Sequence, residues 1–321
     1  MKKLLKLSLT LGIIFVFAGG LIFLIGFASS GFNFDTLSGI NTETVTKAET
    51  EENKYDKIVI DFSISDITVV FDPDADNVSV SYPILKNKRG DALTAVTVSE
   101  NGGTISLKET RLFKYSLITV FYNEKKSKLT VTVPEQRAIS LNINADTNDV
   151  IFVGNGQLEE LTVSVDTADI KAGNSELSVN GAVNIESDTG DVSFRSIAAE
   201  SLTAEIDTGD LTLRDAMIIK KIDISIDTGD VKLLGNIIAE NIEIDTDTGD
   251  IDAEDALLDA ESIDLSVDTG DIEVKVAGKK SDYNITVEKD TGKVNVTNQT
   301  GGTRNLSIEV NTGDCDVFFA E

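Results

Sequence analysis

The tetrapeptide Asp-Thr-Gly-Asp, complete at Asp227-Thr228-Gly229-Asp230, returns throughout the C-terminal half of the chain. A repeat of about 20 residues is typical of a stacked array, in which each unit buries its apolar face against the next. This period constrains the fold more than any other feature of the sequence. Complete or modified copies, 19 to 22 residues apart, begin at Asp146, Asp166, Asp188, Asp207, Asp227, Asp247, Asp268, Asp290 and Asn311.

Apolar residues keep fixed positions relative to each copy. The positions five and three residues before the tetrapeptide, and the first and third positions after it, are apolar in every copy, with polar residues between them. A spacing of two indicates strands and argues against helices. We therefore predict an all-β fold, a parallel β-solenoid (β-helix) whose coils contain two short strands joined by an arc at the tetrapeptide. Eight steps of about 4.8 Å would give this array a length of roughly 40 Å.

Threonine stands second in all nine copies, and glycine stands third in seven. A β-branched side chain suits an extended corner, and stacked hydroxyls are able to hydrogen-bond along the rod. Gly and Asn148 at the third position predict positive φ, so Ala168 predicts either strain or a differently shaped coil. The predicted structural ladder consists of Thr147, Thr167, Thr189, Thr208, Thr228, Thr248, Thr269, Thr291 and Thr312.

The motif aspartates make the array strongly acidic. Residues 138–321 contain 12 Lys and Arg against 39 Asp and Glu, which equals the net charge of −27 of the whole chain. Like charges about 4.8 Å apart repel by roughly 1 kcal/mol in water, so a stack of carboxylates needs compensation. Hydrogen bonds from backbone N–H groups two residues further along the turn are one explanation, and calcium is the alternative. The calcium candidates are Asp188, Asp191, Asp207, Asp210, Asp227, Asp230, Asp247, Asp250, Asp268 and Asp271.

Composition excludes many functions. The chain has no His, and its one cysteine, Cys315, lies in an apolar column where a small core residue is expected. Asp-Thr-Gly also occurs in aspartic proteases, but nine stacked copies do not form a facing pair. A glycan-active β-helix enzyme is the enzymatic alternative, although the short segments between columns leave no room for a cleft. We expect no enzymatic activity, no cofactor other than calcium, and no nucleic-acid binding by so acidic a surface.

The N-terminal segment predicts a membrane anchor. Lys2, Lys3 and Lys6 precede an uncharged, mostly apolar run that ends near Phe27, which is long enough to cross a bilayer as a helix. The lysines place the N-terminus in the cytoplasm and the remainder outside the cell. A cleaved signal peptide is the alternative. We assign 1–27 to a cytoplasmic tip and transmembrane helix of a single-pass protein of the cell membrane, and 28–54 to a polar stalk.

Residues 55–137 are predicted to form irregular first coils and a cap, before the regular solenoid at 138–321. Strand patterns at 58–62 and 64–71 resemble a decayed coil. Basic and aromatic residues then cluster between Lys86 and Arg137. They either cover the open end of the array or contact lipid headgroups or wall polymers. The predicted contact residues are Lys108, Arg111, Lys114, Lys125, Lys126 and Lys128.

The chain ends in Val317-Phe318-Phe319, directly after the last copy of the motif. An open final coil would allow self-association, because an uncovered strand edge tends to pair with another chain. Alternatively, Phe318 and Phe319 fold over the end and close it. The sequence alone leaves both arrangements open.

The anchor, the strand pair at 58–71, the segment Leu129-Thr-Val-Thr-Val-Pro134 and the repeated Asp-Thr-Gly-Asp-Val together resemble the bacterial putative-adhesin family of unknown function. That family includes LiaG-type proteins, which occur with cell-envelope stress modules of Gram-positive bacteria. The resemblance covers about residues 55–321 and implies β-strand repeats without known catalytic residues. It therefore implies a fold and supplies no mechanism.

The sequence accordingly predicts a membrane-anchored, extracellular, non-enzymatic β-solenoid that acts as an adhesin, a spacer or an envelope-stress accessory. Its expected partners are the membrane, envelope proteins and wall polymers. The alternatives are a calcium-binding solenoid, a glycan-active enzyme and a scaffold that assembles end to end.

Overall fold

The computed structural model describes residues 40–112 and 127–320. The predicted anchor at 1–27 lies outside these residues, as do Lys114, Lys125 and Lys126. No helix in the described part has the length and hydropathy needed to cross a membrane. The described part consists of 22 strands that join in one sheet, together with the short 3-10 turn η3 (Lys280–Asp282).

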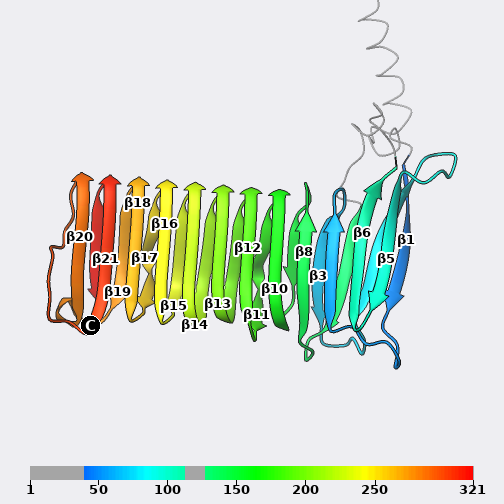
Figure 1. Cartoon of the computed structure of the whole chain (residues 1–321), viewed down its shortest axis with the longest axis horizontal. Helices are drawn as coiled ribbons and strands as arrows, with labels where there is room; N and C mark the ends of the chain where they lie inside the picture. The colour runs from blue at the N-terminus through cyan, green and yellow to red at the C-terminus, as the bar shows by residue number, and fades with distance from the viewer. Residues whose placement is uncertain (1–39, 113–126, 321) are drawn as a thin grey trace, which may run out of the picture.

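The strands vary from short segments to strands that cover almost a whole coil (Figure 1). The N-terminal strands are β1 (Asn41–Ala48), β2 (Lys57–Phe62), β3 (Asp66–Asp72), β4 (Ser79–Lys86), β5 (Thr94–Asn101), β6 (Thr104–Arg111) and β7 (Lys128–Pro134). The array contains β8 (Ile139–Ala145), β9 (Val150–Val153), β10 (Gly156–Thr167), β11 (Ile170–Val179), β12 (Ala182–Thr189), β13 (Val192–Thr208), β14 (Leu211–Thr228), β15 (Val231–Ile238), β16 (Asn241–Thr248), β17 (Ile251–Asp259), β18 (Ser262–Thr269), β19 (Ile272–Ala277), β20 (Tyr283–Thr291), β21 (Arg304–Thr312) and β22 (Cys315–Ala320).

Successive repeats stack as parallel strands in a constant register. β14 pairs with β16 so that Ile222 lies beside Ile242 and Thr228 lies beside Thr248. The strands that lead into the tetrapeptide all point to one edge of the rod in Figure 1. These observations confirm the predicted all-β, parallel β-solenoid.

Each regular coil also contains a third strand segment that the sequence analysis did not predict. β13 and β14 pair in three runs, and the middle run joins 197–199 to 216–218. Ala216 and Ile218 are buried there, whereas Met217 and Ile219 are 62% and 70% exposed. In the sequence, 216–219 reads Ala-Met-Ile-Ile, so the alternation of apolar and polar residues that identifies a strand is missing here.

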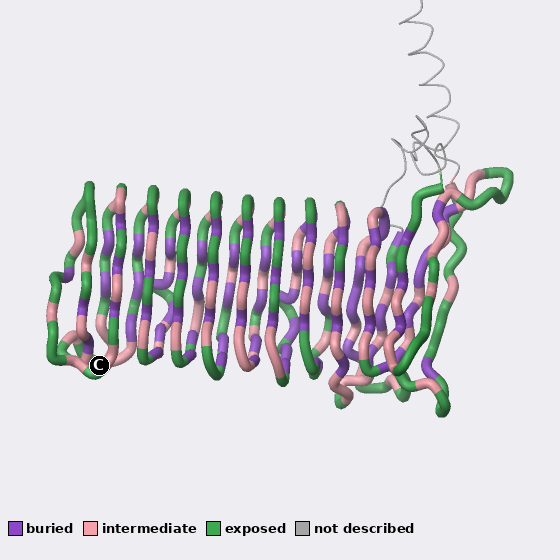
Figure 2. The backbone as a smooth tube through the Cα atoms, in the orientation of Figure 1, coloured by how far each residue is buried: buried purple, intermediate pink, exposed green. Residues whose placement is uncertain are grey.

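The interior is a continuous stack of apolar side chains. Ile222 and Ile224 are 0% and 1% exposed, and the equivalent residues of the other coils belong to the same core cluster, except for Val287, which is partly buried against it. Figure 2 shows that buried and exposed positions alternate along each coil, whereas the arcs are exposed. Burying one such side chain contributes about 1.5–3 kcal/mol, and only a neighbouring coil provides the surface that buries it.

The N-terminal coils do not follow the chain order. β2 lies between β6 and β8, and β3 lies between β7 and β9. The coil made by β6 and β7 is therefore further out than the coil that precedes it in the sequence. The antiparallel strands β5 on β6, and β4 with β1 on β7, complete this end.

The prediction of a polar stalk at 28–54 is wrong for residues 41–48. This segment forms β1, which pairs antiparallel with β4 along its whole length. Thr42, Thr44 and Thr46 are exposed, so the strand has no apolar face. Without that face the alternation that identifies a strand is missing, although the backbone hydrogen bonds still form.

The C-terminal coils are also out of chain order, so the last coil is not an open end. β21 lies between β18 and β20, and β20 is the outermost strand. The sequence accounts for this order, because β20 has Lys289 where β21 has the buried Val310. Phe319 packs on the ring of Tyr283, with 5.8 Å between centroids, whereas Phe318 stays 42% exposed.

Stacking in register predicts that a whole coil is removable. Deletion of 209–228 joins Thr208 to Gly229 and restores the tetrapeptide, so we expect a folded rod shorter by about 4.8 Å. Deletion of 209–218 removes half a coil and is the matched control, because it places polar residues in the core columns. Small-angle scattering and circular dichroism should show a folded, shorter first variant and an unfolded second one. Equal behaviour of the two variants would contradict the register.

Candidate functional site

The fourth-position aspartates bind the backbone of the neighbouring coil. Oδ1 of Asp210 accepts a hydrogen bond from the N–H of Asp230 at 2.9 Å, and Oδ1 of Asp230 accepts one from the N–H of Asp250 at 2.9 Å. We call this series of contacts the aspartate ladder. Its eight steps, of 2.7–3.2 Å, are Asp149–Asp169, Asp169–Asp191, Asp191–Asp210, Asp210–Asp230, Asp230–Asp250, Asp250–Asp271, Asp271–Asp314 and Asp314–Lys293.

The aspartate ladder runs between coils, whereas the sequence analysis placed the aspartate hydrogen bonds within one turn. The backbone on either side of each aspartate keeps its own bonds to the next coil. Gly209 donates to the carbonyl of Thr228 at 2.9 Å, and Leu211 donates to the carbonyl of Asp230 at 2.9 Å. The carboxylate therefore supplies the acceptor for the one N–H of the arc, that of the fourth-position residue, that has no backbone carbonyl as its partner.

Glycine at the third position is required for two reasons. Gly229 has φ of 146°, a region that side chains rarely allow. A Cβ on Gly229 would also lie 2.0 Å from the carbonyl oxygen of Gly209 in the neighbouring coil. The close approach of successive arcs depends on the missing side chain.

The two exceptions to glycine have a different arc. In the described part of the chain, Asp215 is the only residue other than glycine with positive φ. Asn148 and Ala168 therefore avoid the strained backbone region, and Ala168 still donates its N–H to the carbonyl of Thr189 at 2.9 Å. Of the two outcomes that Ala168 predicted, the differently shaped coil is the one observed.

The threonines of the predicted ladder lie in register and are exposed to solvent. Thr208, Thr228 and Thr248 are direct neighbours across three coils. The hydroxyl of Thr147 donates to the carbonyl of Ser63 at 3.3 Å, which joins the regular array to the N-terminal coils. Hydrogen bonds between threonine hydroxyls stay a prediction.

The ten calcium candidates are all exposed, five at the first position of the motif and five in the aspartate ladder. Among the residues that the structure describes, no three acidic, His or Cys side chains are placed to hold a metal ion. One charge in the first-position stack is replaced by an amide, because Asn311 stands next to Asp268 and donates to it at 2.6 Å. Calcium binding stays a prediction.

At particular coils, a lysine compensates the negative charge of the ladder carboxylates. Nζ of Lys171 lies 2.7 Å from Asp149 and 2.8 Å from Asp169. The hydrogen bond from Lys171 lowers the pKa of Asp169. Burial alone would lower the pKa of Lys171, but the two carboxylates outweigh burial and raise it. This lysine therefore stabilises the first steps of the ladder.

The predicted basic contact surface is only partly described. Lys108 forms an ion pair with Asp61, and Nη2 of Arg111 donates to the carbonyl of Ser63 at 2.7 Å. Lys128, the first residue of β7, is exposed. The described basic residues therefore surround the arc that joins β2 to β3.

Glu109 is a buried carboxylate that the sequence analysis missed. It is 4% exposed, and its Oε2 accepts hydrogen bonds from the N–H groups of Ser63 and Ile64 at 3.0 and 2.9 Å. Oε1 has no hydrogen-bond partner among the described residues, and burial raises the pKa of this carboxyl. Glu109 thus caps the arc of a neighbouring coil, as the ladder aspartates do. In the sequence, the feature that could have indicated this role is a charged residue at a position where the strand alternation expects a core residue, two residues after Leu107.

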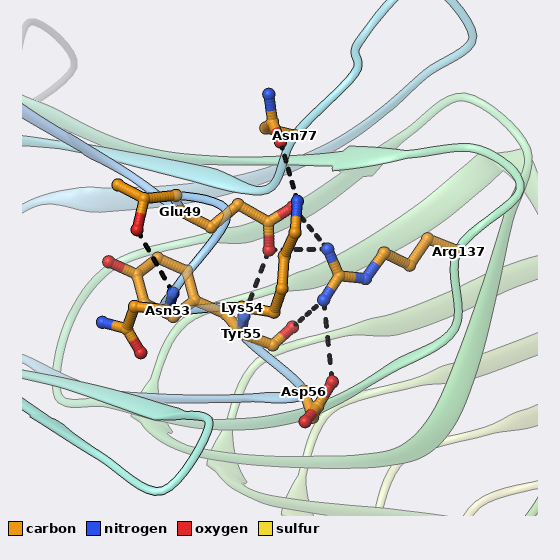
Figure 3. A network of polar contacts seen from close by, with 8 residues as sticks. Glu49, Asn53, Lys54, Tyr55, Asp56, Asn77 and Arg137 are labelled. Carbon is orange, nitrogen blue, oxygen red and sulfur yellow. Dashed lines mark hydrogen bonds and ion pairs between the residues drawn. The ribbon is translucent and has the colours of Figure 1, made fainter.

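A second buried carboxylate, Glu49, fixes the N-terminal segment (Figure 3). Arg137 donates to both oxygens of Glu49, at 2.6 Å to Oε2, and to the carbonyl of Tyr55 at 2.8 Å. The N–H of Tyr55 donates to Oε2 of Glu49 at 3.1 Å. Burial raises the pKa of Glu49, but these hydrogen bonds outweigh burial and lower it. The contact joins the end of β1 to the segment between β7 and β8.

Cys315 occupies the core column as predicted. It is 1% exposed, and burial raises the pKa of its thiol to about 12. A thiol of this kind is protonated and unreactive at neutral pH. Cys315 is therefore a packing residue.

Two hollows of the described surface have modest volumes. One of 290 Å³ is lined by residues that include Gln136, Gln157 and Glu176, and one of 250 Å³ by residues that include Phe194, Arg195 and Arg214. Sites for small molecules usually occupy about 300–1,000 Å³. Neither hollow reaches that range.

These features define a class of protein: an acidic parallel β-solenoid whose arcs are joined by carboxylates. The particular family is that of the model Toastrack DUF4097, which matches residues 55–317, and the chain belongs to it. This confirms the resemblance predicted from the sequence, whereas a relation to LiaG-type proteins stays a prediction. No curated protein matches the chain.

Solved structures with a similar fold are distant. A putative adhesin (BF0245) from Bacteroides fragilis is 18% identical, with a TM-score of 0.46, over 86% of this chain and 97% of that chain. A putative lipid binding protein from Parabacteroides distasonis is 13% identical, with a TM-score of 0.40, over 88% and 97%. A putative adhesin from the same organism is 14% identical, with a TM-score of 0.38, over 86% and 97%. At these values the likeness says nothing further about the function of this chain.

The arc geometry predicts that Gly229→Ala is strongly destabilising. The variant combines an unfavourable φ with a contact of 2.0 Å, so we expect a loss of about 2–5 kcal/mol in the free energy of unfolding. Gly173→Ala is the control, because the nearest atom to its Cβ is 3.9 Å away. Urea denaturation of the two variants measures the difference, and a stable Gly229→Ala would contradict the close approach of the arcs.

The buried ion pair predicts a pH-dependent effect of Arg137→Ala. At neutral pH the variant leaves the Glu49 carboxylate buried without its partner, and we expect a loss of about 2–3 kcal/mol. The lowered pKa of Glu49 gives stability that is present above its ordinary value of 4.5 and lost as pH falls through the folded value. The gap between wild type and variant should therefore shrink in acid. Lys54→Ala, whose ammonium lies 3.5 Å from Glu49, is the control with an expected effect below about 1 kcal/mol.

Proposed function

We propose that the chain is a membrane-anchored, extracellular and non-enzymatic rod that serves as an adhesin, a spacer or an accessory of the cell envelope. The observation that carries this proposal is the aspartate ladder. In the ladder, eight aspartates use Oδ1 to hold neighbouring coils together, which gives these carboxylates a structural role.

Three further ionisable groups of the described part support the same proposal. Glu49 and Glu109 are buried and cap backbone N–H groups, and Cys315 is buried in the core. Catalytic groups usually lie in a cleft that excludes water around a substrate. The two hollows described above, of 290 and 250 Å³, lie just below the usual range for small-molecule sites.

The arrangement of the rod supports a role at a distance from the membrane. β1 lies at one end and β20 at the other (Figure 1). From β5 to β20 there are eleven strand steps, which correspond to roughly 50 Å at about 4.8 Å each. A chain held in the membrane by residues 7–27 would place β1 near the bilayer and β20 away from it.

Cell fractionation tests the anchor. The full chain should stay in the membrane fraction after washes with high salt and with alkaline carbonate, since a spanning helix is not removed by either. Protease added to intact cells should digest the solenoid, because the proposal places it outside. A chain without residues 1–34 is the control and should be soluble. Release of the full chain by either wash would contradict the anchor.

A further inference from the structure

The last motif copies contain an insertion. Thr269 and Thr312 lie side by side in adjacent coils but are 43 positions apart in the sequence. Removing the 23 residues from 280 to 302 would leave 20 positions, which is the spacing between Thr208 and Thr228. The chain therefore leaves the regular solenoid after β19, forms one additional coil, and returns to fill the position that it skipped.

The inserted segment becomes the outermost coil. β20 pairs with β21 from Tyr283 to Thr291, and Val294 forms an isolated bridge with Cys315 of β22. Tyr283 is fully buried, and its hydroxyl donates to the carbonyl of Ala277 at 2.6 Å. The insertion thus covers the outer edges of β21 and the start of β22.

At this end of the rod, side-chain amides form hydrogen bonds with backbone groups that have no neighbouring strand. Oδ1 of Asn295 accepts from the N–H of Val317 at 3.0 Å, and its Nδ2 donates to the carbonyl of Val317 at 3.1 Å. On the outer side of β20, Oδ1 of Asn298 accepts from the N–H of Val287 at 2.7 Å. Gln299 exchanges backbone hydrogen bonds with Ile285 at 2.8 and 2.9 Å. These contacts occupy backbone groups that would otherwise pair with another strand.

The aspartate ladder also stops in this segment. Lys293 occupies the fourth motif position of the outermost coil, and its N–H donates to Oδ1 of Asp314 at 2.8 Å. A lysine side chain has no acceptor for the N–H of a further coil. Asp314, in contrast, carries the acceptor that a further coil would use.

We propose that residues 280–302 are an inserted cap over a strand edge that fits a second copy of this chain, and that this cap keeps two rods from joining at this end. The covered edge consists of β21, β22 and the carboxylate of Asp314. A second copy is the occupant that fits, because β20 already shows that this edge accepts a coil of the same repeat in register. The proposal does not depend on the function proposed above.

Deletion of 280–302 in the full chain tests the cap. In detergent micelles, light scattering should give a protein mass that at least doubles as concentration rises, whereas the wild-type chain should remain a monomer. Deletion of the internal coil 209–228 is the matched control, since it shortens the rod by a similar length but keeps the cap. A folded, monomeric 280–302 deletion would overturn the proposal, and so would a wild-type chain that associates as strongly.

A milder variant tests the proposal if the deletion variant does not fold. Asn295→Ala combined with Asn298→Ala keeps β20 on β21 but frees the N–H of Val317, on the covered strand β22, and the N–H of Val287, on the outer side of the cap. Both groups are then open to a strand of a second copy. We expect a measurable rise in dimer at high concentration, and Asn236→Ala, on an internal coil, should show none. A strictly monomeric double variant would then overturn the proposal.

Discussion

The hydrogen bond that a backbone N–H of one coil donates to an aspartate carboxylate of the preceding coil is the interaction on which the rest of the structure depends. Parallel strands satisfy their own backbone groups, but in each arc the backbone carbonyl that would accept from the N–H of the fourth-position residue does not reach it. Oδ1 of each fourth-position aspartate replaces that carbonyl, as at Asp230, and the sheet hydrogen bonding continues around the corner. Glycine makes the arc narrow enough for this contact, because a carbonyl of the preceding coil lies where a Cβ would be, as that of Gly209 does beside Gly229.

The same interaction explains how so acidic a rod stays folded. A carboxylate that accepts a backbone hydrogen bond has part of its charge compensated by an N–H dipole. Remaining repulsion is reduced locally, by Lys171 between two ladder aspartates and by Asn311 beside Asp268. The ladder therefore accounts for eight of the 39 acidic residues at 138–321 as contacts between coils.

The regular part of the fold could be predicted from sequence because each apolar column recurs in every coil. The ends could not, because chain order and spatial order differ there. The pairing of β2 with both β6 and β8, and of β21 with β18, depends on which coil best tolerates an open edge. For the site, the positions of the aspartates and of Cys315 could be predicted from the sequence. It missed Glu49 and Glu109, whose roles depend on contacts with distant residues such as Arg137 and Ser63.

Hydrogen exchange at the fourth-position amides tests the central claim most directly. If the carboxylates continue the sheet around the arcs, the amide protons of Asp230 and Asp250 should exchange as slowly as those of Ile224 and Ile244 in the strands. In the variant Asp230→Ala, the amide proton of Asp250 should exchange faster, because its acceptor is gone. The amide proton at position 230 should stay protected, because the carboxylate of Asp210 still accepts from it. Rapid exchange of these amides in the wild-type chain, at the rate of an exposed loop, would contradict the account.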